Sequence, residues 1–202
     1  GFGSLRRMND LFRTEYHLSP TALRKKAAAG TSHVGQITVS LGYRPPYRWT
    51  EMLRFLAARA ILGVERVEGD VYLRTVRLAD KDGTRHSGWI QVAHKPAKNR
   101  LDVTVSDTLI PVLSQVLARV RNLFDLYCDP DVIDQTLQTM NDLRPGLCVL
   151  GTRLPGCFEP FEMSVRAILG QQISVKAAST LAGRLVESLG MPVDTGVEGL
   201  TH

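Results

Sequence analysis

Two adjacent glutamines, Gln171 and Gln172, separate two apolar segments of the chain. The ten residues before them, FEMSVRAILG (161–170), carry apolar side chains at helical spacing. A glutamine amide both donates and accepts hydrogen bonds and carries no charge. Such a pair suits contact with nucleic-acid base edges, or filling the gap left when a base leaves the stack. The amides could instead bond the free carbonyls at the helix end, and spacing alone favours that structural role.

Capping signals place this glutamine pair on a turn between two helices. Pro160 fits the first position of the preceding helix, and Gly170 can adopt the left-handed conformation that ends it. Ser174 suits the cap of the following helix, which Gly190 would stop. The apolar face predicted for that second helix includes Ala178, Leu181, Leu185 and Leu189.

The segment from residue 36 to 106 has the pattern of a small sheet. Apolar and polar residues alternate over 36–41, which predicts a half-buried strand, and tandem prolines at 45–46 must end it. A helix follows from about Thr50 and would stop at Gly63. Four more strand-like runs cover 64–67, 71–78, 88–94 and 101–106. This order predicts an α+β fold with a small antiparallel sheet and a packed helix.

Helical patterns replace the strand signal after residue 107. Pro111 and Pro130 each fit the start of a helix. The second of these helices has four apolar residues that we predict to be buried: Val132, Ile133, Leu137 and Met140. We therefore expect an all-α half from residue 111 onward.

Charge and cysteine content narrow the class of protein. The 202 residues carry a net charge of +5, and the cations are 19 Arg and six Lys. Arginine's planar donor fork matches phosphate, so this bias indicates a polyanion partner, although an Arg-rich proteome gives the same balance. Cys128, Cys148 and Cys157 form no CxxC motif and no even set, which fits a reducing cytoplasm without a metal site. We expect no cofactor, and no membrane partner because no apolar run approaches ~20 residues.

The first 24 residues, GFGSLRRMNDLFRTEYHLSPTALR, predict two short helices joined by a turn. Spacing alone favours a helical hairpin with a solvated basic face over half of a helix-turn-helix. The stretch resembles the end of an AraC-type transcription-factor domain, however. That resemblance implies that Ser4, Arg6 and Arg7 lie near the DNA-facing start of a recognition helix, with promoter DNA as partner. We expect this domain end over 1–26 and a linker over 27–35.

Three separated blocks carry a second resemblance: LGYRPPYRWTEMLRFLAARAILGVERV, LFDLYCDPDVI and RPGLCVLGTRLPGCFEPFEMSVRAILGQQISVKAASTLAGRLV. Residues 35–202 resemble AlkA-type 3-methyladenine DNA glycosylases II, of the helix-hairpin-helix superfamily. The resemblance implies a TBP-like α+β domain over 36–110 and an incomplete helical glycosylase domain over 111–202. It also implies hydrolysis of the N-glycosidic bonds of alkylated bases in double-stranded DNA. An AraC-type tail before this body is similar to fusions of the Ada adaptive-response regulator with AlkA.

The same resemblance assigns roles residue by residue. Phe55 matches an aromatic that lines the damaged-base pocket, although core packing is an alternative role for a helical Phe. Gln171 matches a pocket-side glutamine. Gln172 falls at the side chain that wedges into the duplex, which is leucine in the best-known form. Arg166 and Lys176 match phosphate contacts by position only.

We identify no catalytic residue in this chain. Base excision needs a carboxylate near the sugar to stabilise an oxocarbenium-like transition state. In the resembling family this Asp follows a Gly-rich helical hairpin, and no such hairpin followed by Asp occurs in the sequence. We therefore expect a copy truncated before the catalytic Asp and inactive alone. Two alternatives stay open: an AraC/Ada-type regulator fragment without catalysis, and a basic α+β ligand-binding protein unrelated to DNA.

Overall fold

A computed structural model describes residues 35–202. The strands are β1 (Gln36–Gly42), β2 (Glu65–Glu68), β3 (Val71–Ala79), β4 (Arg85–Lys95) and β5 (Arg100–Ser106). The helices are α3 (Trp49–Ala57), α4 (Leu113–Leu123), α5 (Pro130–Leu137), α6 (Met140–Leu143), α7 (Pro160–Leu169) and α8 (Val175–Leu189), with 3-10 turns η1 (Pro96–Lys98) and η2 (Asp107–Val112). The helix-turn-helix predicted over 1–26, most of the predicted linker, and Ser4, Arg6 and Arg7 lie outside the described residues.

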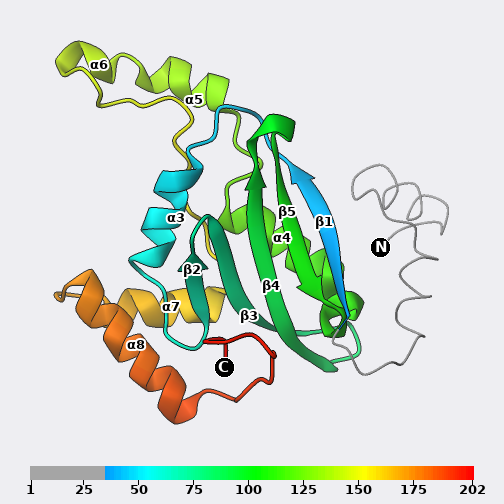
Figure 1. The fold of residues 1–202 in the computed structure, drawn as a ribbon. Coiled ribbons are helices and arrows are strands. Elements are labelled where there is room, and N and C mark those ends of the chain that lie inside the picture. The colour runs from blue at the N-terminus through cyan, green and yellow to red at the C-terminus, as the bar shows by residue number, and fades with distance from the viewer. Residues whose placement is uncertain (1–34) are drawn as a thin grey trace.

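The five strands form one antiparallel sheet in the order β1-β5-β4-β3-β2 (Figure 1). Strands β2 to β5 follow one another as a meander, while α3 connects β1 at one edge to β2 at the other. The β1–β5 register runs from the pair Gln36–Ser106 to the pair Gly42–Arg100. The α+β class and all five strand-like runs are thereby confirmed.

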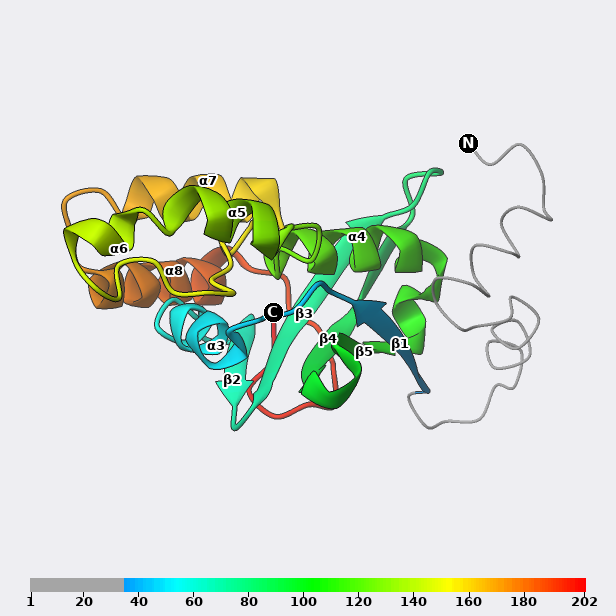
Figure 2. The same ribbon diagram turned by 90° about the horizontal axis from the view of Figure 1, so that it is seen from above.

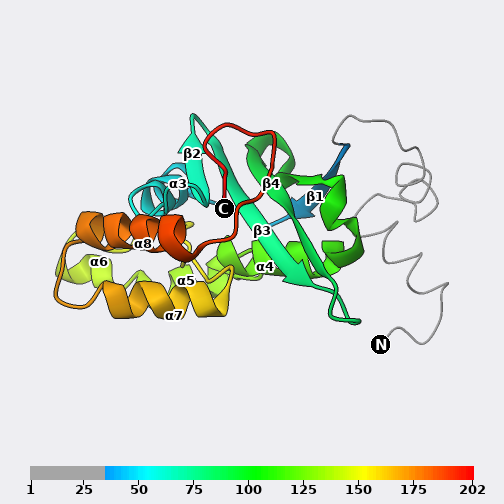
Figure 3. The same cartoon turned by 90° about the horizontal axis from the view of Figure 1, so that it is seen from below.

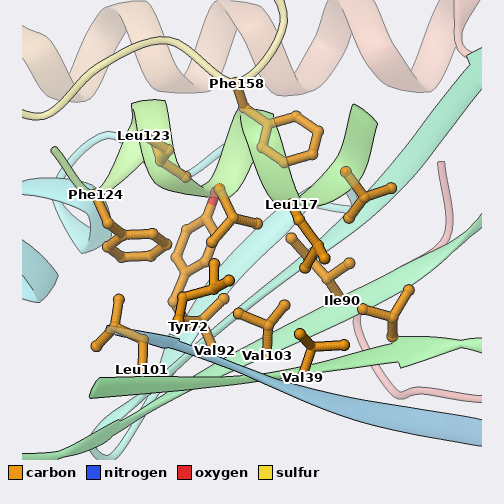
Figure 4. Packing of buried hydrophobic residues seen from close by; sticks show 14 of the residues in the cluster. Val39, Tyr72, Ile90, Val92, Leu101, Val103, Leu117, Leu123, Phe124 and Phe158 are labelled. Carbon is orange, nitrogen blue, oxygen red and sulfur yellow. The ribbon is translucent and has the colours of Figure 1, made fainter. Parts of the chain in front are cut away.

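One face of the sheet packs against α4. Alternation along β1 sends every second residue into this layer, where Val39 and Leu41 are fully buried. From α4, Leu117 and Val120 meet the sheet, and Tyr72 of β3 lies edge-on to the ring of Phe124. Figure 4 shows Val39, Tyr72, Leu117 and Phe124 in the space between helix and strands.

This core extends beyond the domain boundary predicted at residue 110. Helix α4 and Phe158, which precedes α7, belong to the same buried cluster as the sheet. The boundary between 36–110 and 111–202 therefore falls inside one core. Helices α7 and α8 lie beyond the β2 edge of the sheet (Figure 2). The helical half of the chain therefore begins with α4, which packs on the sheet itself.

The opposite face of the sheet is partly covered by the segment after α8. Leu73 and Trp89 alternate with residues of the main core, and Leu200 packs against them. The backbone N–H of Thr201 donates to the Gly63 carbonyl at 2.8 Å, and the Thr75 hydroxyl donates to the His202 carbonyl. These contacts hold the segment beside β2 and β3 (Figure 3).

Two helical expectations are wrong. Helix α3 ends at Ala57 and not at Gly63, because the N–H groups of Arg59 and Ala60 turn back to the carbonyls three residues earlier. The four apolar residues predicted to be buried around α5 are 37–60% exposed: Val132, Ile133, Leu137 and Met140. The α5–α6 segment projects away from the sheet (Figure 1), so its apolar stripe gains no partner within residues 35–202. None of the helices in this range is long and apolar enough to cross a membrane.

Replacing Leu117 with Ala tests whether α4 is part of the sheet core. Leu117 is fully buried, and such a truncation costs about 2–5 kcal/mol of unfolding free energy. Leu143→Ala, at a helical side chain that is 84% exposed, is the control and should cost less than about 0.5 kcal/mol. Urea denaturation followed by circular dichroism measures both. Equal small losses would show that α4 does not stabilise the sheet.

Candidate functional site

A cavity of about 300 Å³ lies between α3, the β2–β3 edge and the α7–α8 pair. One wall is apolar and is formed by Phe55, Leu56, Phe158, Met163, Ile173 and Val175. The charged residues Arg59, Glu65, Arg74, Glu162 and Arg166 also line it. The cavity thus combines an aromatic wall with a group of ionised side chains, a composition typical of ligand sites.

Phe55 reaches this cavity because it lies off the buried face of α3. The buried residues of the helix are Trp49, Met52, Leu53 and Leu56. Phe55 stays 39% exposed, and the guanidinium carbon of Arg59 lies 3.8 Å from its ring centroid. Core packing, the alternative role considered for this residue, does not describe its position.

Phe158 enters the cavity from the loop before α7. Its backbone carbonyl accepts a hydrogen bond from Nη1 of Arg119 at 2.7 Å. The guanidinium carbon of Arg74 lies 4.1 Å from its ring centroid, within cation–π range. Contacts from α4 and β3 therefore fix the second aromatic ring. No motif in the sequence singled out Phe158.

Four charged side chains, Glu65, Arg74, Glu162 and Arg166, form an ion-pair network that joins α7 to the sheet. Glu65 and Arg74 are directly opposed in the β2–β3 register, so both leave the sheet on the same face. Arg74 Nη2 donates to Glu162 Oε2 at 2.7 Å, and Arg166 Nη2 donates to Glu162 Oε1 at 2.7 Å. Arg166 also donates to Glu65. Each sheet residue thus has a counter-ion on α7.

Burial strengthens this network and sets its protonation. The side chains of Arg74 and Glu65 are only about 5% exposed. Burial raises the pKa of Tyr72 to about 12, so its hydroxyl stays protonated and donates to Glu65 Oε2 at 2.7 Å. Burial lowers the pKa of Arg166 to about 10, which still leaves the guanidinium charged at neutral pH. Arg166 therefore stays a cationic donor to the carboxylates of Glu65 and Glu162 near pH 7.

Arg166 is a partly buried member of this network. The side chain is 21% exposed, and its Nη1 also donates to the Arg59 carbonyl at 2.6 Å. Its donors are directed to protein groups in this structure, and its phosphate contact stays a prediction. The sequence offered one signal for the network, since Arg74 is in phase with buried positions of β3 such as Val76 and Leu78. A charge on a buried face needs a partner.

The glutamine turn borders the same cavity. Gly170 and Ile173, which flank the pair, line the cavity, whereas Gln171 and Gln172 are exposed. The left-handed residue is Gln172, with φ of 61°, and Gly170 keeps a helical φ of −78°. The expectation that Gly170 adopts the left-handed conformation is therefore wrong. A left-handed non-glycine residue costs roughly 1 kcal/mol.

The residues after the turn follow the capping prediction. The Ser174 hydroxyl accepts from the Ala177 N–H at 3.2 Å, and α8 ends before Gly190. Lys176 is exposed in the first turn of α8 and lines a neighbouring groove with Arg184 and Glu187. Its phosphate contact also stays a prediction. The structure thus brings Phe55 and the glutamine turn to one cavity and places Lys176 outside it.

Replacing Arg166 with Met should destabilise the chain strongly. The change leaves Glu65 and Glu162 buried without this counter-ion, which costs about 3–5 kcal/mol in comparable buried pairs. Arg48→Met at the Arg48–Glu51 pair is the matched control, because those side chains are 39% and 45% exposed, and it should cost under about 1 kcal/mol. Chemical denaturation of both variants decides. A loss for Arg166→Met no larger than for Arg48→Met would contradict the proposed coupling between α7 and the sheet.

Comparison with known proteins now gives these features a context. The family model described as "AlkA N-terminal domain" matches residues 38–159. DNA-3-methyladenine glycosylase 2 of Escherichia coli (strain K12) is 38% identical over 155 residues, which is 77% of this chain and 51% of that protein. The "Probable bifunctional transcriptional activator/DNA repair enzyme AlkA" of Mycobacterium tuberculosis (strain ATCC 25618 / H37Rv) is 37% identical over 207 residues, covering 100% of this chain and 40% of that protein.

A solved structure agrees at the level of fold. The 3-methyladenine DNA glycosylase from Archaeoglobus fulgidus superposes with a TM-score of 0.56 at 20% identity, over 80% of this chain and 53% of that one. The chain therefore spans about half or less of the length of the relatives that it matches. The family model covers more than half of the chain and includes the block around Phe55 and the block LFDLYCDPDVI, so the predicted resemblance to AlkA-type glycosylases is confirmed. The chain belongs to the AlkA N-terminal domain family.

Proposed function

We propose that this chain supplies the damage-recognition part of a DNA glycosylase that removes alkylated bases, of the 3-methyladenine type, by hydrolysing the N-glycosidic bond. The proposal depends on one observation above all: an aromatic-walled cavity opens beside an exposed glutamine turn. The names of the E. coli and M. tuberculosis relatives support it, because they describe a glycosylase and a DNA repair enzyme.

The cavity suits a single base that has left the duplex. Its volume of about 300 Å³ lies at the lower end of small-molecule pockets. The half-exposed ring of Phe55 offers a flat surface on which a base can stack, an interaction worth about 1–3 kcal/mol per base. An alkylated base is electron-poor and often cationic, which strengthens stacking on an aromatic face.

The turn at the cavity mouth gives the glutamines their proposed roles. In our proposal Gln172 fills the gap that the extruded base leaves and bonds the orphaned partner base. Gln171 contacts the pocket side, and Lys176 and Arg166 approach the phosphates. The left-handed backbone of Gln172 supports this, since strained residues persist where the surrounding structure and function require them.

Recognition and excision are separable in this proposal. Both carboxylates among the described cavity residues, Glu65 and Glu162, are ion-paired with arginines. A carboxylate neutralised in this way stabilises a developing positive charge on the sugar poorly. We therefore expect the 202-residue chain alone to bind alkylated DNA without excising the base. The free cysteines at 128, 148 and 157 fit a function in the cytoplasm, where thiols stay reduced.

A duplex with one 2′-fluoro-stabilised 7-methylguanine tests the base pocket. The chain should bind this duplex more tightly than the unmodified one, and Phe55→Ala should reduce the preference about fivefold or more, because it removes the stacking surface. Phe161→Ala, at a ring that is 76% exposed and outside the cavity, is the matched control. Fluorescence anisotropy measures the DNA affinity of both variants. A salt series tests the alternative, because a weak salt dependence of this affinity would favour a ligand-binding protein unrelated to DNA. Equal preference in wild type and Phe55→Ala would reject the pocket.

A second function has support from one relative. The M. tuberculosis protein is named a transcriptional activator as well as a repair enzyme, and its match covers all 202 residues of this chain. We propose that residues 1–26 contact promoter DNA through Ser4, Arg6 and Arg7. Selection from a random duplex library should then enrich a sequence motif, and the Arg6→Ala/Arg7→Ala double variant should lose it. Lys25→Ala/Lys26→Ala removes the same charge and should keep the motif. Enrichment by the arginine variant equal to wild type would reject this role.

A further inference from the structure

Arg59 covers the aromatic surface on which a base would stack. Its guanidinium carbon lies 3.8 Å from the centroid of the Phe55 ring, and its Nη1 donates to the Phe55 carbonyl at 3.3 Å. Both residues line the cavity. The guanidinium therefore lies within the space that a planar ring stacked on Phe55 would enter.

The backbone of Arg59 is held firmly, but its side chain is not. The carbonyl accepts from Arg166 Nη1 at 2.6 Å, which fixes the residue at the cavity wall just beyond the end of α3. The side chain has a long hydrogen bond and a cation–π contact, and within residues 35–202 no carboxylate forms an ion pair with it. Such a contact is weak at a partly exposed site. The side chain can therefore leave Phe55 without breaking an ion pair.

Arg59 also sets the charge of the cavity. The two other arginines of the lining, Arg74 and Arg166, are balanced by the carboxylates of Glu65 and Glu162. Arg59 is the one unbalanced charge among the described lining residues, so it gives the cavity an excess of one positive charge. A cationic ring that enters while Arg59 stays in place meets a like charge in close contact.

From this geometry we propose that Arg59 is a displaceable cover and a specificity-determining residue of the cavity, exchanged for the ring that stacks on Phe55. This inference rests on the proposed base pocket. Arg59 and a cationic base compete for one aromatic face. In the empty site the guanidinium covers that face, and a free cationic ring must displace it without another group to receive it. A DNA duplex supplies phosphates that can receive the released guanidinium, since arginine pairs readily with phosphate oxygens. Duplex binding and uncovering of Phe55 are thereby coupled.

This competition predicts opposite effects of one substitution on two ligands. Arg59→Ala should tighten binding of 1-methyladenosine, whose ring is cationic at neutral pH, by about two- to fivefold, the equivalent of a lost cation–π contact. Adenosine, which is neutral, should gain less. Affinity of the same variant for the alkylated duplex should fall, because a phosphate partner is lost. Arg59→Lys, which keeps the charge without the planar fork, should behave between wild type and Arg59→Ala.

NMR titration of the 202-residue chain with each nucleoside, and anisotropy with the duplex, measure these effects. Arg54→Ala is the matched control, because Arg54 is exposed on α3 beside Phe55 and does not line the cavity. Thermal melting of each variant establishes that it folds. Opposite shifts for nucleoside and duplex in Arg59→Ala alone would support the proposal.

Two results would overturn it, and they differ in what else they reject. If Arg59→Ala leaves nucleoside affinity unchanged while Phe55→Ala still abolishes binding, the covering role is wrong and the base pocket stands. If no nucleoside binds wild type or Arg59→Ala, and Phe55→Ala leaves duplex preference intact, then removal of the guanidinium uncovers no site and both proposals fail.

Discussion

Ion pairing between the β2–β3 edge and α7 is the interaction on which the site depends. Glu65 and Arg74 project from opposed positions of the sheet, and α7 supplies a counter-ion to each through Arg166 and Glu162. Charges this deeply buried are tolerated only when their partners and hydrogen bonds are in place. The helix is therefore held at one position against the sheet, and the glutamine turn at its end is held with it.

The ion-pair network adds little net charge to the cavity. Two carboxylates and two guanidinium groups offset one another, so their fields largely cancel inside the cavity. In our proposal, selection among rings then falls to the aromatic wall and to Arg59, the residue whose charge is not offset. An uncharged amide at the exposed turn fits the same proposal, since an amide can bond a base without adding to the local charge.

Local patterns predicted the sheet well and the environment of the helices poorly. Alternation over 36–41 depends on one buried face, and β1 has such a face in the fold. The apolar stripe of α5 was as clear as that of α4, but burial depends on a partner that the stripe does not specify. The turn was predicted from Gly170, yet the left-handed residue is Gln172, two residues later. The role of Phe55 was predicted from the family resemblance. The position of Arg59 over its ring was not predicted, because a folded-back side chain leaves no periodic signal in the sequence.

The cavity is assembled from segments far apart in the chain, and this links its precision to stability. Phe55 comes from α3, the ion pairs come from β2, β3 and α7, and Phe158 comes from the loop before α7. Each segment is positioned by contacts that also stabilise the fold, such as the Arg119 bond to the Phe158 carbonyl. Arg59 differs, because its backbone is part of that framework while its side chain contributes only a weak contact. A group that can move without unfolding anything is the one suited to exchange with a ligand, and in this cavity that group lies on the stacking surface itself.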